Sequence, residues 1–434
     1  MYRVSQFITV FALCLLAGTV AALIWANAAP ESYQDFVELR LIDGFPVGYP
    51  NPDATGVGGR TLTLQYLINN VLMALFFLLA GKEIWEAVVQ EHGSLRGARA
   101  VVPLAATVGG MLGPVLIYLT MAATTRSSVS ADLAGGWAIP ASTDLALAYV
   151  VGRAAFGPGH PGLRLLMLIA ICDNIAGLLI LGLFYPSGAL RPVWLVLPLL
   201  ASLLAFGLFN WLPRRLDRGD QLRKWSSFVR KRLSIWPYVV AGVASWYGFQ
   251  EAGLHPALGL LPIVPAMPHA DRAFGFFAEA EEYLTDSLNQ LAHLLTWPVA
   301  ASLFLYGLTN CGIEFAALDA PTSVTFLALV IGKPIGICTV ALLAARWSRL
   351  GLPHGINRND LIVVGLVAGV GLTVPILMTI SALPSGAVQE AAKLGVVLSL
   401  FAAPVAIAVA RLRQVGRWAA VQNRRAPSKA GGGV

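Results

Sequence analysis

Residues 135–144 read GGWAIPASTD, and residues 365–375 read GLVAGVGLTVP. Both stretches interrupt long apolar segments. Pro140 removes a backbone donor shortly before Asp144, and proline inside a helix kinks or breaks it. Glycines and Pro375 surround Thr373 in the second stretch. Helices interrupted at corresponding places in two halves of a chain are typical of membrane proteins with inverted repeats, where such breaks meet at the bilayer midplane. The two stretches therefore predict a crossing of discontinuous helices.

The composition around these breaks is that of a polytopic membrane protein. Of the 434 residues, 57% are hydrophobic and 12% are charged, whereas soluble domains carry about 25% charged residues. A spanning helix uses about 20 mostly apolar residues, so about twelve helices account for most of the hydrophobic positions. This excludes a single-pass receptor, a secreted disulfide scaffold and a nucleic-acid-binding domain. The four cysteines form no CxxC pair, so neither a zinc site nor a redox couple is indicated.

Hydropathy divides the chain into about twelve apolar segments. We predict an all-α integral membrane protein with about twelve transmembrane helices in an inverted repeat. The discontinuous helices 4 and 11 should cross at the midplane, in one transport domain over residues 1–415. The first segment follows Arg3 as a signal peptide would, but it is too long for a typical leader, so we predict a retained helix. The segments are 7–26, 62–81, 100–122, 136–152, 162–185, 192–212, 233–249, 253–268, 288–309, 323–345, 360–382 and 391–410.

The loop charges predict the orientation. Basic residues follow the even-numbered segments, and an excess of Lys and Arg marks cytoplasmic loops. Both termini should therefore be cytoplasmic, and residues 416–434 should form a disordered basic tail. The net charge of +7 then reflects topology rather than a nucleic-acid partner. The basic residues are Arg96, Arg99, Arg214, Arg215, Arg218, Arg223, Lys224, Arg230, Lys231, Arg232, Arg346, Arg349, Arg358, Arg411, Arg413, Arg417, Arg424, Arg425 and Lys429.

The connection from Pro268 to Asn289 holds the longest run of mixed charge. Two interpretations stay open. It is a solvated surface helix, or it is a cytoplasmic funnel that senses pH, because clustered carboxylates beside a histidine can titrate near neutrality. Its charged and titratable residues are His269, Asp271, Arg272, Glu279, Glu281, Glu282 and Asp286.

Ionisable side chains inside spanning segments are costly and mark candidate sites. Asp144, Asp173 and Lys333 lie in the fourth, fifth and tenth segments, and Glu83 lies near the end of the second. Each helix break leaves partly positive N-termini and partly negative C-termini, so we predict that Asp144 offsets the former and Lys333 the latter. A packing role for a buried Lys–Asp pair is the alternative. The uncharged polar companions are Asn70, Thr143, Asn174, Asn310 and Thr373.

Several motifs resemble those of NhaA-type Na⁺/H⁺ antiporters, over nearly the whole chain from about residue 8 to 415. The resemblance implies a secondary transporter of the bacterial inner membrane that exchanges Na⁺ or Li⁺ for protons by alternating access, in pH and sodium homeostasis. It implies no enzyme activity and no cofactor besides the transported ions. It further implies that membrane lipid surrounds the protein and that the external stretch 30–60 forms a contact between two copies of the chain. The motifs are PASTDLA (140–146), ICDNIAG (171–177), LGLFY (181–185), IGKPIGI (331–337), GVGLT (369–373), INNVLMALFFLL (68–79) and WP (297–298).

The sequence departs from the family pattern at three places. The family's fifth helix usually carries two adjacent aspartates, and the second is Asn174 here. Asn70 stands where the family's second helix usually has an aspartate. The family's eleventh helix usually continues past its threonine without proline, whereas here Pro375 follows Thr373 by two residues. In the family, the aspartate at the position of Asn174 is the main cation ligand.

By the same resemblance, the aspartate at Asp173 pairs with the lysine at Lys333. The predicted site therefore uses oxygen ligands for Na⁺ from Asp173, Asn174 and Thr143, with Asp144 and Lys333 as further site residues. Asn70, Glu83 and Thr373 are accessory candidates.

The expected mechanism is competition, because a carboxylate in a dry site binds either Na⁺ or H⁺. Asparagine offers a carbonyl oxygen, a hard ligand that suits an alkali cation, but it neither supplies a full charge nor carries a proton. Three alternatives stay open. They are a transporter of the same fold with another solute or without proton coupling, a non-transporting sensor or scaffold, and an intramembrane aspartyl hydrolase built on Asp144 and Asp173.

Overall fold

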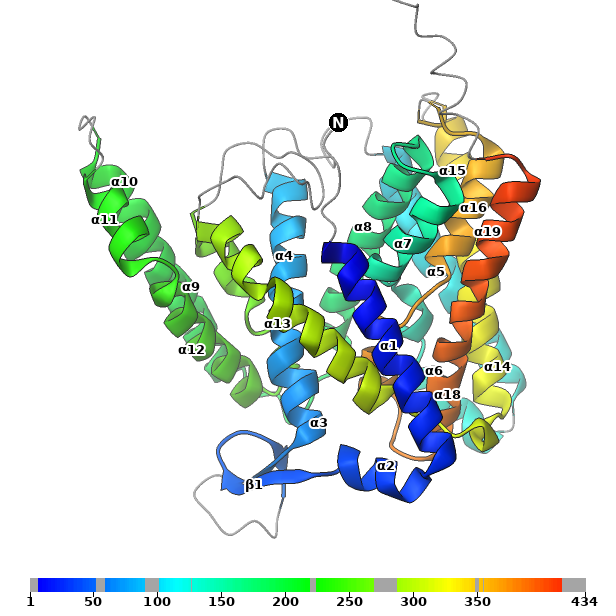
Figure 1. The fold of residues 1–434 in the computed structure, drawn as a ribbon, viewed down its shortest axis with the longest axis horizontal. Coiled ribbons are helices and arrows are strands. Elements are labelled where there is room, and N and C mark those ends of the chain that lie inside the picture. Colours follow the sequence, from blue (N-terminus) through cyan, green and yellow to red (C-terminus); the bar gives the residue numbers. More distant parts are fainter. Residues whose placement is uncertain are drawn as a thin grey trace, which may run out of the picture.

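The computed structural model describes residues 7–51, 59–89, 101–125, 127–218, 224–268, 287–347, 351–353 and 355–415. These residues form a helical bundle with one small β-sheet at one end (Figure 1). Residues 269–286, which hold the charged residues of the mixed-charge connection, the tail at 416–434 and the loop with Arg96 and Arg99 lie outside the described residues, as do residues 348–350 and 354.

The N-terminal third contains the sheet and the first long helices. The sheet is antiparallel with strand order β1-β3-β2, and Thr63 ends β3 and caps the following helix by accepting from the Tyr66 amide. That helix continues through a π-helical turn, η1, into α4. The elements are α1 (Phe7–Ala28), α2 (Pro30–Val37), β1 (Arg40–Phe45), β2 (Tyr49–Pro50), β3 (Arg60–Thr63), α3 (Leu64–Tyr66), η1 (Leu67–Leu72), α4 (Met73–Val89) and α5 (Val101–Thr124).

The middle third contains the first broken segment and a peripheral helix pair. α9 and α12 lie side by side at the outer edge of the bundle (Figure 1), and apolar side chains cover their exposed surfaces. The elements are α6 (Ser127–Gly135), η3 (Ile139–Ala141), α7 (Leu145–Phe156), α8 (Pro161–Phe184), η4 (Pro192–Leu195), α9 (Val196–Phe206), η5 (Gly207–Trp211), α10 (Leu212–Leu216), α11 (Lys224–Phe228), η6 (Val229–Leu233), α12 (Trp236–Ala252), η7 (Pro256–Leu258) and η8 (Leu261–Ala266).

The last third contains the second broken segment. α16 begins with a capping box of Asn357 and Asp360 and ends at Ala368, and α17 starts at Thr373. The elements are α13 (Ser287–Asn310), η10 (Phe315–Ala317), α14 (Ala320–Leu327), η11 (Ala328–Gly332), α15 (Lys333–Trp347), α16 (Arg358–Ala368), α17 (Thr373–Ala382), α18 (Ala387–Leu398), η12 (Ser399–Phe401) and α19 (Ala402–Leu412).

Eight helices of the described residues are long and apolar enough to cross a membrane, or nine if α16 and α17 form one span bent by 51°. The predicted membrane-spanning, helical fold is therefore confirmed, while the count of twelve is not. If α16 and α17 are counted as one span, the difference lies in the fourth, seventh and eighth segments. The fourth is broken, α12 has 17 residues, and Pro256–Ala266 forms only a short apolar helix.

Two close helix contacts organise the bundle. α5 packs along α15, where Gly109 and Gly113 of α5 face Gly336 of α15 so closely that a Cβ on Gly336 would overlap the Gly109 carbonyl. α1 packs along α13 through Gly18 and Gly307 in the same way. Small residues permit this backbone approach, which stabilises helix pairs in lipid. One continuous apolar core then surrounds the two broken segments.

Candidate functional site

The break in the fourth segment begins where α6 ends at Gly135. The chain forms the short helix η3 with Pro140 inside it and runs extended from Ser142 to Asp144 before α7 begins. Asp144 is the N-cap of α7, and its Oδ1 accepts from the Leu147 amide at 2.9 Å. The predicted interruption at Pro140 therefore occurs, and it ends at the aspartate.

Asp144 also caps the second broken segment. Its Oδ2 accepts from the Thr373 amide at 3.1 Å and from the Thr373 hydroxyl at 2.7 Å. Thr373 is the first residue of α17. One carboxylate thus contacts the partly positive N-termini of two half-helices, which is the electrostatic role expected for Asp144.

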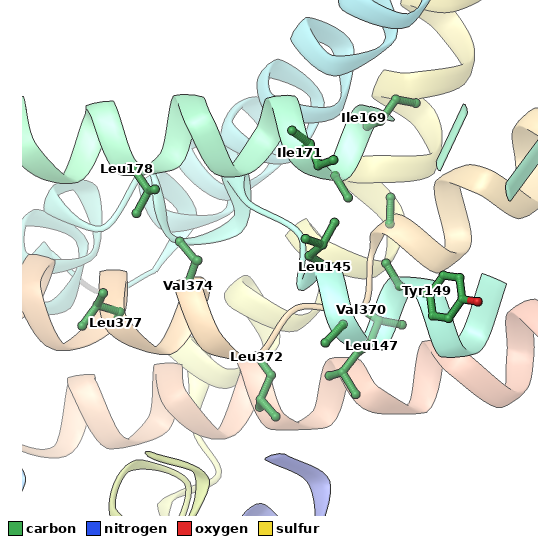
Figure 2. Close-up of a cluster of buried hydrophobic side chains, with 14 of the residues drawn as sticks. Leu145, Leu147, Tyr149, Ile169, Ile171, Leu178, Val370, Leu372, Val374 and Leu377 are labelled. Atoms are coloured by element: carbon green, nitrogen blue, oxygen red, sulfur yellow. The ribbon is translucent and has the colours of Figure 1, made fainter. Parts of the chain in front are cut away.

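The two breaks lie against each other. The Asp144 amide donates to the Val370 carbonyl at 3.4 Å, and the Thr143 hydroxyl lies 3.1 Å from the Ala368 carbonyl. Figure 2 shows apolar side chains of both breaks and of α8 packed around this crossing. They include Leu145, Leu147, Ile171, Val370, Leu372 and Val374, each at most 6% exposed.

Lys333 is the first residue of α15, contacts the break in the fourth segment and is fully buried. Its Nζ donates to the Asp173 Oδ2 at 3.0 Å, to the Thr143 hydroxyl at 2.6 Å and to the Ala141 carbonyl at 3.1 Å. Ala141 ends η3, so the ammonium group contacts the partly negative end of that helix. All three ammonium hydrogens have an acceptor, which is what a buried lysine requires.

Asp173 is equally buried, at 0% exposure. Its Oδ2 accepts from Lys333 and, at 2.8 Å, from the Thr143 hydroxyl. Its Oδ1 has no hydrogen-bond partner and faces Gly110, where an added Cβ would lie 3.9 Å away. A buried carboxylate with one oxygen paired and one free is a group that can accept a proton or a cation at the free oxygen.

Asn174 follows Asp173 on α8, and its buried Oδ1 also lacks a hydrogen-bond partner. The described residues thus contain two adjacent side chains that each offer an unpartnered oxygen. The Thr143 hydroxyl is less available to an ion, because it already accepts from Lys333 and has the Asp173 carboxylate and the Ala368 carbonyl as acceptors. The structure brings Thr143, Asp173 and Lys333 together and places Asp144 with Thr373 beside them.

The accessory candidates Asn70 and Glu83 make their hydrogen bonds elsewhere. Asn70 donates to the Tyr66 carbonyl at 3.3 Å within its own helix. Glu83 accepts from the neighbouring Lys82 at 3.2 Å, and Lys82 also reaches Glu86 at 3.1 Å. All three charged residues are buried at one end of α4. Sequence reasoning singled out only Glu83 of this group.

Two π-helical turns adjoin candidate residues, and nothing in the sequence signalled them. η1 contains Asn69 and Asn70, and η11 ends immediately before Lys333. Such turns shift the angular position of the residues that follow and are frequent at functional sites. In η1, Asn69 exchanges two hydrogen bonds with Asn310 of α13, at 2.9 and 2.8 Å.

Two further residues hold the unwound chain between α16 and α17. The Ser399 hydroxyl accepts from the Gly371 amide at 3.2 Å and donates to its carbonyl at 3.0 Å. The Tyr306 hydroxyl donates to the Thr373 carbonyl at 2.9 Å. Both side chains are fully buried. They satisfy backbone groups that helix breaking leaves unpaired, as irregular backbone at membrane depth requires. Sequence analysis missed both, because hydroxyl groups inside apolar helices are common.

No cluster of three or more His, Cys, Asp or Glu side chains that could hold a metal ion occurs in the described part of the chain. The unpartnered oxygens at the crossing are few and mixed in type: one carboxylate oxygen of Asp173, one amide oxygen of Asn174 and the hydroxyl of Ser142. Such a set suits weak, reversible contact with a hard cation rather than a permanently held metal.

Comparison with known proteins places this geometry in a family context. The sequence profile of the family described as Na⁺/H⁺ antiporter 1 matches residues 4–410. "Na(+)/H(+) antiporter NhaA" of Jannaschia sp. (strain CCS1) is 52% identical over 415 residues, covering 96% of this chain and 99% of the relative. "Na(+)/H(+) antiporter NhaA 2" of Pelobacter propionicus is 37% identical over 411 residues, covering 93% and 96%.

Among solved structures, the sodium proton antiporter MjNhaP1 from Methanocaldococcus jannaschii resembles this chain with a TM-score of 0.44 and 11% identity. The match covers 84% of this chain and 88% of that one.

Proposed function

Because the chain belongs to the Na⁺/H⁺ antiporter 1 family and exchanges cations for protons across a membrane, we propose that Asp173 is the group at which cation and proton compete. The single observation that carries this proposal is the Asp173 carboxylate itself, which is fully buried and has one oxygen paired with Lys333 and one without a partner. A second ion can reach the free oxygen without first breaking the Lys333 contact.

The competition follows from the cost of burying charge. An unpaired carboxylate is costly in a low-dielectric interior, and binding either H⁺ or Na⁺ removes that cost. The loaded carrier can then change conformation with its site neutralised. Asn174 supplies a neutral oxygen next to Asp173, and Thr143 fixes the orientation of the carboxylate through its 2.8 Å hydrogen bond. Na⁺ is the cation that these hard oxygens suit, with Li⁺ as the smaller alternative.

The charge count favours electroneutral exchange. Asn174 carries no proton, so Asp173 is the one acid of the fifth-helix pair. Lys333 donates to three acceptors and keeps its charge most readily in that setting. One H⁺ then exchanges for one Na⁺. Release of a proton from Lys333 on cation binding would add a second proton and make the exchange electrogenic, and the voltage test in the Discussion distinguishes the two.

The loop charges support an orientation with both termini in the cytoplasm and with the β-sheet end of the bundle outside. Membership of the antiporter family supports a bacterial inner membrane as the location. Residues 30–60, which include most of the sheet, are the proposed contact between two copies of the chain, and membrane lipid covers the exposed apolar helices such as α9. Residues 1–415 act as one transport domain in this proposal.

The rival functions have less support. A hydrolase needs two carboxylates that share a proton, whereas Asp144 and Asp173 make separate sets of contacts in the described residues. Asp144 has both oxygens occupied by helix caps, so it is a structural charge in this proposal and not a reacting acid. A sensor without transport, or a transporter of another solute, draws no support from the names of the relatives.

The test is cation-dependent proton flux in proteoliposomes that contain a pH-sensitive dye, with Na⁺, Li⁺ and K⁺ added in turn. The wild type should respond to Na⁺ or Li⁺, and Asp173→Asn should lose the response. Glu390→Gln is the matched control, because that carboxylate is 40% exposed and lies in α18 away from the crossing. Substantial flux in Asp173→Asn would overturn the proposed role of Asp173.

A further inference from the structure

A cavity of about 470 Å³ lies at the sheet end of the bundle. We call it the sheet-side cavity. β2 and β3 line one side, the chain that follows α8 lines another, and the end of α12 a third. Its lining also includes Asn69 and Asn70 of η1 and Leu377 of α17, the half-helix that begins at the crossing. In the orientation proposed above, this cavity opens to the outside.

One ion pair spans the lining of this cavity. The Arg60 Nη1 of β3 lies 2.6 Å from the Glu251 Oε1 of α12, and the two side chains are 21% and 12% exposed. The same Nη1 donates to the Pro46 carbonyl at 3.0 Å. Gln250 donates to that carbonyl at 3.0 Å and accepts from the Tyr66 hydroxyl at 3.0 Å. The guanidinium group is therefore held in one place against the carboxylate.

The charges of the lining are unbalanced. Arg60, Arg191 and Glu251 are the Arg, Lys, Asp and Glu side chains that line the cavity in the described part of the chain. Their sum is one positive charge, and Asn69 and Asn70 add neutral amides. Glu251 is thus the carboxylate through which this cavity would hold a cation. Arg60 of the same chain already forms an ion pair with that carboxylate.

We propose that Arg60 is a tethered cation that keeps external Na⁺ from collecting at Glu251 and so lowers the affinity of the outward-facing site for the ion just exported. The inference rests on the proposed orientation and exchange. A carboxylate in a confined cavity concentrates cations, and a fixed opposite charge cancels that effect. For a carrier that releases Na⁺ at this mouth, the positive lining favours release and disfavours rebinding.

The signs of the expected effects separate this role from a structural one. Arg60→Gln changes the lining from one positive charge to zero, whereas Glu251→Gln changes it to two. The first variant should bind external Na⁺ more tightly than the wild type and the second more weakly, each by about two- to tenfold for a unit charge acting across the cavity. If the ion pair only fastened β3 to α12, the two variants would behave alike, because each breaks the same bond.

The experiment measures ²²Na⁺ efflux from right-side-out vesicles with an inward proton gradient, while unlabelled Na⁺ outside is varied at constant ionic strength. The quantity compared is the external Na⁺ concentration that halves the efflux rate. It should fall in Arg60→Gln, rise in Glu251→Gln and return near the wild-type value in the double variant. Arg60→Lys should keep the wild-type half-inhibiting concentration. Arg40 is an exposed residue of β1 outside the cavity, so Arg40→Gln is the control that should leave this concentration unchanged.

Ionic strength supplies a second readout. The differences should shrink when the constant background of choline chloride is raised, because salt ions that enter the cavity screen the charges of its lining. Shifts of the same direction in both single variants, or no shift in Arg60→Gln, would overturn the inference while efflux itself continues. Absence of proton-driven Na⁺ efflux in the wild type would instead overturn the proposed function, so the two failures are distinguishable.

Discussion

Replacing Lys333 with alanine removes the cation that neutralises Asp173 and leaves three acceptors without their donor. The structure sets the size of the effect. Lys333 and Asp173 are both fully buried, and removal of one partner from a buried ion pair costs about 3–5 kcal/mol. The Ala141 carbonyl also loses its donor at the end of η3. We expect a decrease in the melting temperature of the purified protein in detergent on the order of 5 °C or more.

Arg413→Ala is the control for that measurement. Arg413 is exposed and donates to the Asn359 Oδ1 at 2.7 Å, and exposed substitutions of this kind change stability by only about 0.5 kcal/mol. The double variant Lys333→Ala/Asp173→Asn should recover part of the lost stability, because it no longer buries an unpaired charge. A melting temperature equal to that of the wild type for Lys333→Ala would show that the lysine does not stabilise Asp173, and the pairing argument would fail.

Three further substitutions test separate features. An imposed membrane potential should leave the initial exchange rate of the wild type, which carries Asn174, unchanged. The variant Asn174→Asp should make that rate voltage-dependent. Acceleration of the wild type by the potential would refute electroneutral exchange. Asp144→Ala removes caps from two half-helices at about 1 kcal/mol each, so its melting temperature should fall and transport should slow. Gly336→Leu should prevent the close approach of α5 and α15 and abolish accumulation of folded protein, while Gly207→Leu, with open space around it, should be tolerated in the same expression assay.

The helix breaks were predictable because their causes are local. Proline removes a donor wherever it stands in a helix, and glycine weakens the helical state. The structure places the interruptions at η3 and between α16 and α17, as Pro140 and the glycines before Thr373 indicate. The number of membrane-spanning helices was harder to predict from the sequence. Hydropathy does not distinguish a full crossing from a short apolar helix such as Pro256–Ala266, since both lie in apolar surroundings.

The π-helical turns and the hydroxyl groups that support the crossing could not be predicted. η11 consists of Ala328–Gly332, an ordinary apolar stretch that packs against α5, and no residue in it is typical of a π-helical turn. Ser399 reaches Gly371 from a different helix, 28 residues along the chain. A serine inside an apolar run more commonly bonds its own helix backbone, so nothing in the sequence distinguished this one.

The sequence alone determined that the chain is a membrane protein, where its apolar segments lie, where two of them break, and which few charges must be buried. These properties follow from composition and from backbone rules that act over a few residues. Only the tertiary structure decided which side chain each of these charges contacts. Asp144 meets Thr373 across 229 positions, Lys333 meets Asp173 across 160, and Arg60 meets Glu251 across 191. The physical reason is that burial requires each charge to find a counter-charge or a hydrogen-bond donor, whereas helix packing decides which one lies within reach.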